Sequence, residues 1–337
     1  MSEDLKKEEV MMPDVNKLII SSSPHLHNSS STSKIMKMVI IAMLPACAAG
    51  VYFFGLNALK VLVISTISCM AIEFVWNKIA GNSCSLKDSS AIVTGLLLGM
   101  NLSAGVPWWI CFVGAILAMV IGKLVYGGLG QNPFNPSLVA RVGLLIGFPS
   151  YMTTWVPTES TTIISCATVK VSDAVSCATP LATNSASIYD LFIGNVAGCL
   201  GETSALAILI GGLFLMAFKI IKWHVPVAFI GSVAIITGLA NMISPEQYQN
   251  GALYHILAGG VFLGAFFMAT DMVTSPMTNS GAFIFGLGCG IITCVIRLWG
   301  SYPEGVSFSI LIMNALVPLI DRYTAKKPFG FQPPKEA

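Results

Sequence analysis

The chain alternates long apolar stretches with short polar ones, and the apolar stretches have the lengths of membrane-spanning helices. A spanning helix needs roughly 20 mostly apolar residues, and shorter runs interrupted by glycine are compatible with broken helices. The pattern therefore predicts an all-α integral membrane protein with about ten transmembrane helices. The predicted spans are residues 35–56, 58–80, 90–104, 106–126, 134–150, 202–222, 225–243, 254–270, 281–299 and 305–321.

The spans form two groups of five on either side of a long polar segment. A predicted first span that begins only after a serine-rich polar tail, with no small-residue cleavage site, favours its retention in the mature protein. The predicted organisation is an amino-terminal tail at 1–34, a first five-helix half at 35–150, a loop at 151–201, a second half at 202–321 and a carboxy-terminal tail at 322–337.

Glycine pairs and polar breaks at similar positions in the two halves indicate an internal repeat. Gly95–Gly99 marks a short third span before a polar break at 101–107, and Gly260–Gly264 has the matching position before a break at 270–276. Short spans broken at corresponding positions are typical of inverted repeats whose broken central helices meet near the membrane midplane. The alternative is that glycine recurs because it lets membrane helices pack closely.

Composition agrees with the span pattern. The chain is 55% hydrophobic and only 10% charged, with a mean hydropathy of +0.77, whereas soluble domains carry about a quarter charged residues. Most Lys and Arg residues fall in segments on the side of the two tails, so both termini are expected to be cytoplasmic and the 151–201 loop external. The net charge of +2 gives no reason to invoke nucleic acid.

The nine cysteines contain no CxxC pair, and we expect no iron–sulfur or zinc site within this chain alone. Most of these thiols fall inside predicted spans, where they behave as small apolar groups. Cys166 and Cys177 share the external loop. They could pair in an oxidising compartment, and two free thiols are an equally good interpretation.

Few ionisable residues fall within the spans, where charge is costly and usually functional or paired. Asp271 could compensate Arg141 or contribute to an ion path. Glu73 and Arg297 lie near predicted span ends, where we expect their side chains to reach water.

The external loop contains Ser-Cys-Ala-Thr twice, at 165–168 and at 176–179. Only the second copy has an acidic residue upstream, Asp173, and Pro180-Leu181 downstream. Without further information, a loop rich in Ser and Thr is a solvated connector. Such a loop nevertheless exposes its hydroxyls to a modifying enzyme.

The second copy resembles the site at which flavin mononucleotide (FMN) is esterified to threonine in the RnfD/NqrB family of membrane flavoproteins. These are subunits of the Rnf complexes and of the Na+-pumping quinone reductases. The resemblance implies that Thr179 carries the FMN covalently through its phosphate, with Asp173, Ser176 and Ala178 as the rest of the attachment motif.

Further blocks extend the resemblance along the chain. One departure is Met272, where the family has proline. The continuation Thr179-Pro180-Leu181 and the absence of a long extension before the first span favour the Rnf branch over the quinone-reductase branch. The other matching blocks are Ser23–His25 with Lys34–Lys37 and Ala42–Ala46, Gly127–Pro136 running into Ala140-Arg141, and Phe267–Asp271 with Val273–Pro276.

The family is also thought to hold an unlinked riboflavin near the cytoplasmic face. Asn132 and Asn135 offer amide groups that suit the uracil-like edge of an isoalloxazine ring, and Phe134 offers a stacking face. We expect these residues and Asp271 to form a riboflavin pocket. The alternative is capping of a helix end with no ligand.

The resemblance implies a urea-transporter-like fold and a place in a bacterial or archaeal plasma membrane. It also implies the function of an Rnf complex, which couples electron transfer between ferredoxin and NAD+ to the movement of Na+ or H+. The expected partners are the other Rnf subunits, RnfA, RnfB, RnfC, RnfE and RnfG, especially RnfG, which also carries FMN. Two alternatives stay open: an NqrB-like component of a quinone reductase, and a solute or ion channel without a redox role.

Overall fold

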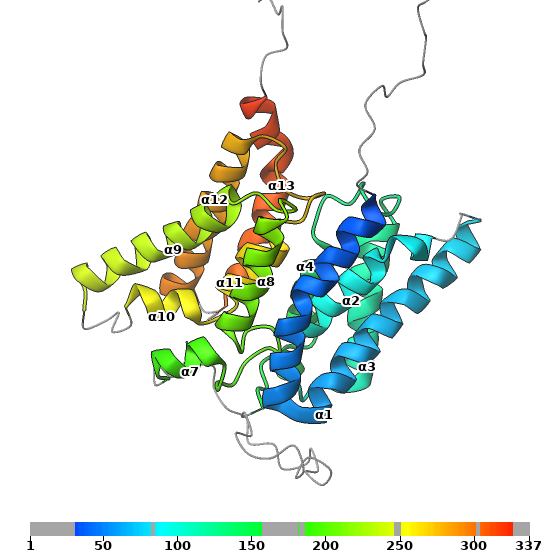
Figure 1. The fold of residues 1–337 in the computed structure, drawn as a ribbon, viewed down its shortest axis with the longest axis horizontal. Helices are drawn as coiled ribbons and strands as arrows, with labels where there is room; N and C mark the ends of the chain where they lie inside the picture. Colours follow the sequence, from blue (N-terminus) through cyan, green and yellow to red (C-terminus); the bar gives the residue numbers. More distant parts are fainter. Residues whose placement is uncertain are drawn as a thin grey trace, which may run out of the picture. The chain divides into compact units, whose positions relative to one another are not determined.

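The computed structural model describes residues 31–81, 85–156, 181, 186–245, 251–300 and 304–325, and every element in this part of the chain is helical (Figure 1). The fold is therefore all-α, as predicted. The elements are α1 (Thr32–Ala80), η2 (Ser85–Asp88), α2 (Ser90–Met100), α3 (Trp108–Ile116), η3 (Leu117–Leu124), α4 (Pro136–Gly147), α5 (Pro149–Met152), α7 (Ile188–Ile193), α8 (Ala205–Ala217), α9 (His224–Ile243), α10 (Ala252–Leu257), α11 (Val261–Leu263), η6 (Gly264–Met268), α12 (Asn279–Trp299) and α13 (Val306–Thr324).

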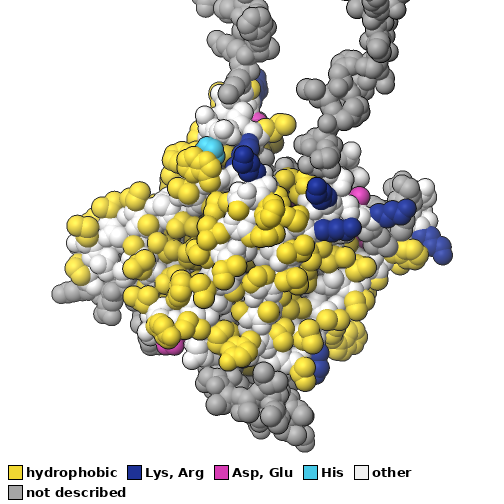
Figure 2. Space-filling view, in the orientation of Figure 1, with side chains coloured by type: hydrophobic (Ala, Val, Ile, Leu, Met, Phe, Trp, Pro, Cys, Tyr) yellow, Lys and Arg dark blue, Asp and Glu magenta, His cyan; other side chains and the backbone are white. Residues whose placement is uncertain are grey.

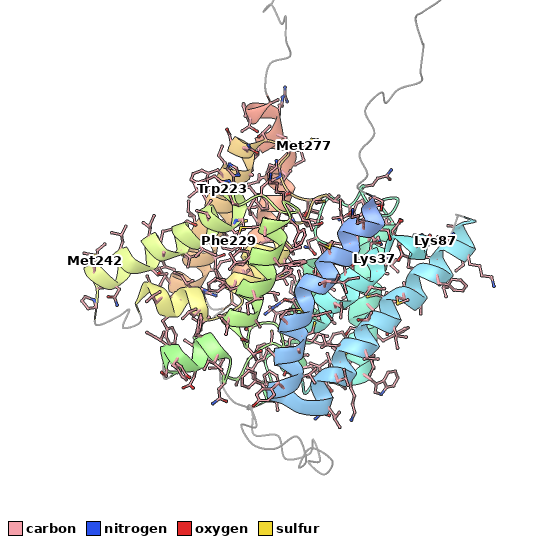
Figure 3. The ribbon with its side chains drawn as sticks, in the orientation of Figure 1. Lys37, Lys87, Trp223, Phe229, Met242 and Met277 are labelled. Carbon is pink, nitrogen blue, oxygen red and sulfur yellow. The ribbon has the colours of Figure 1, made fainter. Side chains whose placement is uncertain are left out.

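Four of these helices, α1, α9, α12 and α13, are long and apolar enough to cross a membrane, with mean hydropathy between 1.3 and 2.1. Four shorter apolar helices span Ser90–Met100, Trp108–Leu124, Pro136–Gly147 and Ala205–Ala217. Figure 2 shows hydrophobic side chains covering the middle of the visible face, with most Lys and Arg toward one end. Phe229 of α9 is fully buried, whereas Met242 of the same helix is 79% exposed (Figure 3). These features are those of a multi-pass membrane protein.

The first helix is folded back on itself at Gly55. This residue has φ 67° and ψ −153°, a backbone conformation that only glycine adopts at little cost. The two arms of α1 run side by side in opposite directions (Figure 1), which corresponds to the first two predicted spans. The beginning of α1 and the end of α13 lie at one end of the bundle, called here the tail end, and the bend of α1 and α7 lie at the opposite end, called here the loop end.

Glycine in the third helix serves close packing. A Cβ added at Gly95 of α2 would lie 2.6 Å from the Cα of Thr66 in the second arm of α1. A Cβ added at Gly99 would lie 3.2 Å from the Cα of Leu62. The two helices thus touch along their backbones, as membrane helices with small residues at the interface commonly do.

The helix α2 ends at Met100, at the predicted break. The backbone groups freed there are satisfied by a distant segment, because Gly201 N–H donates to Met100 O at 2.7 Å and Leu200 N–H donates to Leu102 O at 3.0 Å. Breaks of this kind are tolerated within a membrane protein when the protein itself supplies the partners.

The predicted span 254–270 is wrong as a single helix. It divides into α10 and the α11–η6 segment, separated at Gly259 and Gly260, which have φ of +71° and +69°. Gly260 therefore turns the chain before a helix, and it is not equivalent to Gly95, which packs within one. The polar break after η6 was predicted, whereas this earlier break was not.

Candidate functional site

A cavity opens near the tail end of the bundle, between the start of α1, the start of α2 and the polar segment after η6. The space between its walls is about 780 Å³, a figure that includes solvent at its open mouth. It is lined by Ile35, Met36, Val39, Ser90, Val93, Thr94, Leu97, Lys123, Leu129, Asn132, Asn135, Pro136, Leu215, Ile220, Ile221, Phe266, Phe267, Thr270, Asp271, Met272 and Val273.

Two π-helical segments contribute to the walls of this cavity. The segment η3 supplies Lys123, and η6 supplies Phe266 and Phe267. Their wide turns are visible in the bonds from Val125 N–H to Val120 O at 3.1 Å and from Ala269 N–H to Gly264 O at 2.7 Å. Stretches of π-helix are rare and frequently occur at functional sites.

Lys123 forms a buried ion pair in the cavity wall. Its Nζ donates to Glu73 Oε1 at 2.9 Å and to Ser90 Oγ at 2.7 Å. The exposed fraction is 3% for the Lys123 side chain and 1% for the Glu73 side chain. The prediction that Glu73 reaches water is therefore wrong: the carboxylate stays inside because a lysine from another helix neutralises it.

The four residues predicted for a riboflavin pocket lie close together, and three of them line the cavity. Asn135 caps α4, because its Oδ1 accepts from Ser137 N–H at 3.1 Å, and its Nδ2 donates to Met268 O at 3.2 Å. Asn132 Nδ2 donates to the carbonyl oxygen of Phe134 at 3.0 Å. The Phe134 side chain is not among the lining residues, and the aromatic faces come from η6.

Asp271 also lines the cavity, where its Oδ2 accepts from Thr274 Oγ1 at 3.2 Å. The prediction that Asp271 compensates Arg141 is wrong. Arg141 instead pairs with Glu304 and with Glu202, whose Oε1 lies 3.6 Å from its Nη2. Nothing in the local sequence signals this pairing, since the two glutamates come from segments far apart along the chain.

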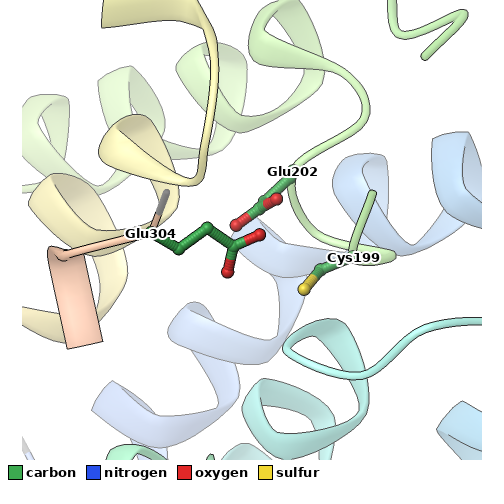
Figure 4. A group of neighbouring side chains, drawn as sticks. All are labelled: Cys199, Glu202 and Glu304. Carbon is green, nitrogen blue, oxygen red and sulfur yellow. The ribbon is translucent and has the colours of Figure 1, made fainter. Parts of the chain in front are cut away.

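The Arg141 pairs belong to a second polar cluster between the cavity and the loop end. Arg141 Nη1 donates to Asn101 Oδ1 at 2.6 Å. Cys199, Glu202 and Glu304 approach one another so that one ligand atom from each lies within 4.8 Å of the others (Figure 4). The Arg141 guanidinium contacts both carboxylates, and the arrangement is that of a buried ion-pair network.

Arg297 binds the backbone carbonyls at the break between α10 and α11, which the sequence did not predict. Its Nη1 donates to His255 O at 2.6 Å, and its Nη2 donates to Ala258 O at 3.0 Å and to Gly259 O at 2.7 Å. Arg297 was predicted to reach water; the residue is partly buried, and its guanidinium donates to the carbonyls that the broken helix leaves open.

The predicted attachment motif, Asp173, Ser176, Ala178 and Thr179, lies outside the described residues, as do Cys166 and Cys177. Leu181 is described. It packs in a small apolar cluster with Leu191 of α7, Tyr254 of α10 and Ala258. The chain immediately after the motif is thus fixed to α7 and α10, beside the Arg297 network.

The fold is that of an all-helical membrane protein with broken helices, and a partly polar cavity opens near one end of it. Residues 19–330 match the family described as NQR2, RnfD, RnfE, and the chain belongs to that family. The D subunit of a Na(+)-translocating ferredoxin:NAD(+) oxidoreductase complex from Acetobacterium woodii is 45% identical over 322 residues, covering 93% of this chain and 95% of the relative.

Two further relatives carry related names. The D subunit of the proton-translocating ferredoxin:NAD(+) oxidoreductase complex from Clostridium ljungdahlii is 40% identical and covers 94% of this chain and 97% of its own. The D subunit of the ion-translocating oxidoreductase complex from Escherichia fergusonii is 38% identical, with coverage of 92% and 98%. Relatives of similar identity are thus named for different ions.

Proposed function

We propose that this chain is the flavin-bearing RnfD component of an Rnf complex in a bacterial plasma membrane. It assembles with the other Rnf subunits and passes electrons across the membrane, and the complex couples ferredoxin:NAD+ electron transfer to Na+ or H+ translocation. Family membership over nearly the whole chain carries this proposal. The ion stays open, because relatives at 45% and 40% identity are named for Na+ and for protons.

The proposed covalent cofactor is FMN on Thr179. The attachment motif carries this proposal, and Leu181, two residues after Thr179, is anchored against Tyr254 and Ala258. Two extended residues span at most about 7 Å, so a phosphoryl group on Thr179 would be tethered close to that anchor. We propose that this flavin takes its electron from the FMN that RnfG carries.

The proposed second cofactor is an unlinked riboflavin in the tail-end cavity. The residues present fit a flat aromatic ring with polar edges. Phe266 and Phe267 contribute aromatic side chains to the lining, and Asn132 and Asp271 contribute side chains that can form hydrogen bonds. A bound flavin supplies the electron-transfer chemistry, and the protein contributes position, charge and exclusion of water.

The proposed topology has ten spans in two inverted five-helix halves, with both tails cytoplasmic and the 151–201 loop external. Supporting it, the start of α1 and the end of α13 lie at the same end of the bundle, whereas α7, which belongs to the loop segment, lies at the opposite end (Figure 1). The chain also breaks after α2 and after η6, at the polar segments that the repeat requires.

The first experiment measures the mass of the denatured protein after co-expression with its flavin transferase, for the native chain, Thr179→Val and Thr168→Val. The proposal expects one FMN increment in the native chain and in Thr168→Val, and none in Thr179→Val. Thr168 is the matched control because it ends the other Ser-Cys-Ala-Thr copy. A native chain without the increment would favour a channel with no redox role.

A further inference from the structure

The position of Lys123 is not explained by the needs of the fold alone. Lysine near the end of a span ordinarily extends to water, but this side chain is only 3% exposed. The π-helical turns of η3 are wider than α-helical turns, and Lys123 occupies the last of them. Within this register the ammonium lies in the cavity wall, bonded to Glu73 and Ser90.

The ion pair presents its positive partner to the cavity. Lys123 and Ser90 are lining residues, whereas Glu73 is not. An ammonium has three N–H donors, and Glu73 and Ser90 take two of them. These two bonds leave one N–H donor of this lining residue unused. The other charged residue that lines the cavity is Asp271, whose carboxylate already accepts from Thr274.

We propose that Lys123 donates its third N–H to the isoalloxazine ring of a flavin in this cavity and raises the midpoint potential of that flavin. This inference rests on the riboflavin proposed above. Transfer of one electron to the ring, from the covalent FMN, adds one negative charge and breaks no bond. A fixed cationic donor stabilises the ring that has gained the charge more than the oxidised ring.

Stability alone gives a weaker account of the pair. A buried ion pair is often replaceable by neutral side chains of similar volume without loss of stability. The π-helical geometry is also associated with the cavity. Both π-helical segments of the described chain, η3 and η6, supply residues to its walls. A positive group beside a reducible ring can stabilise the negative charge that the ring gains, and a neutral pair would lack this effect.

The test uses the whole complex purified from membranes, with three variants of this chain: Lys123→Met, the neutral pair Lys123→Met with Glu73→Gln, and Lys87→Met. Two quantities are measured, the non-covalent riboflavin released by acid and the midpoint potential of that flavin by optical redox titration. Lys87 is the matched control because it lies near the same end of the bundle, away from the cavity wall (Figure 3).

The proposal expects the neutral-pair variant to keep its riboflavin and to show a more negative midpoint potential, while Lys87→Met matches the native complex. The neutral pair decides the question even where Lys123→Met alone fails to assemble, because it leaves no unpaired carboxylate. Riboflavin present at an unchanged potential in the neutral pair would overturn the role of Lys123 and leave the cavity assignment intact. A native complex without unlinked riboflavin would overturn both.

Discussion

Replacement of Arg141 by methionine should destabilise the protein strongly, because it removes the cation from the buried network around Glu202 and Glu304. The Arg141 and Glu202 side chains are 9% and 7% exposed, and their charged atoms are 3.6 Å apart. Two unit charges at that distance attract by about 4–5 kcal/mol at an effective dielectric constant of about 20. Removing one member of a buried pair typically costs about 3–5 kcal/mol, since the partner stays buried without compensation.

The assay is thermal unfolding of the detergent-solubilised protein, read by a thiol-reactive fluorophore. Buried thiols make this readout suitable, because Cys69, Cys111 and Cys289 are all 0% exposed and react only when the fold opens. A loss of about 3–5 kcal/mol corresponds to a Tm lowered by about 4–7 °C for a chain of this length. Arg322→Met is the matched control, since Arg322 is exposed at the end of α13, and it should change the Tm little.

A rescue variant separates charge from packing. If the cost is electrostatic, changing Glu202 and Glu304 to glutamine in the Arg141→Met background should recover most of the lost Tm. The reasoning is refuted if Arg141→Met unfolds within about 2 °C of the native protein, well short of the shift expected for such a loss, or if the neutralised background recovers nothing. The second outcome would mean that Arg141 acts through its volume or its bond to Asn101.

Three further predictions concern packing and capping. Gly95→Ala should lower the free energy of unfolding by about 1–3 kcal/mol, because the added methyl group overpacks against Thr66. Gly231 has open space around it, so Gly231→Ala should raise the free energy of unfolding by up to about 1 kcal/mol through helix propensity. Equal Tm values for the two variants would contradict the close approach of α2 to α1. Asn135→Ala should cost about 1–2 kcal/mol through the lost cap, and Asn135→Asp should restore part of it; chemical denaturation compares the two. Arg297→Lys should lower the Tm nearly as much as Arg297→Met, because one ammonium does not reproduce a planar fork bonded to three carbonyls; full stability of the lysine variant would argue against the cap.

Most helix positions, with the exception of the span 254–270, could be predicted because local composition determines them. The predicted span 225–243 and the observed α9, His224–Ile243, differ by one residue at the start. The polar segment after Met100 was predictable for the same reason. Three of the four residues proposed for the riboflavin pocket also come together, since each lies beside a helix end whose polar sequence marks it.

The charge pairs could not be predicted, because they join segments that are distant along the chain. Lys123 and Glu73 are 50 residues apart, and Arg141 and Glu304 are 163 residues apart. The inward placement of Lys123 depends on the π-helical register of η3, and an α-helical pattern gives no sign of it. The break at Gly259 likewise depends on a guanidinium from α12 that satisfies the open carbonyls.

One residue joins the two polar regions of the protein. Met268 ends η6, and its carbonyl accepts from Asn135 in the cavity wall at 3.2 Å. Its sulfur lies 3.9 Å from Nδ2 of Asn101, which also accepts from Arg141 through its Oδ1. The cavity near the tail end and the ion-pair network nearer the loop end therefore share a continuous chain of contacts through the broken helix ends. A shift of η6 that widens the cavity would move Met268 and its contact with Asn101, so the two regions should respond together to a bound ligand.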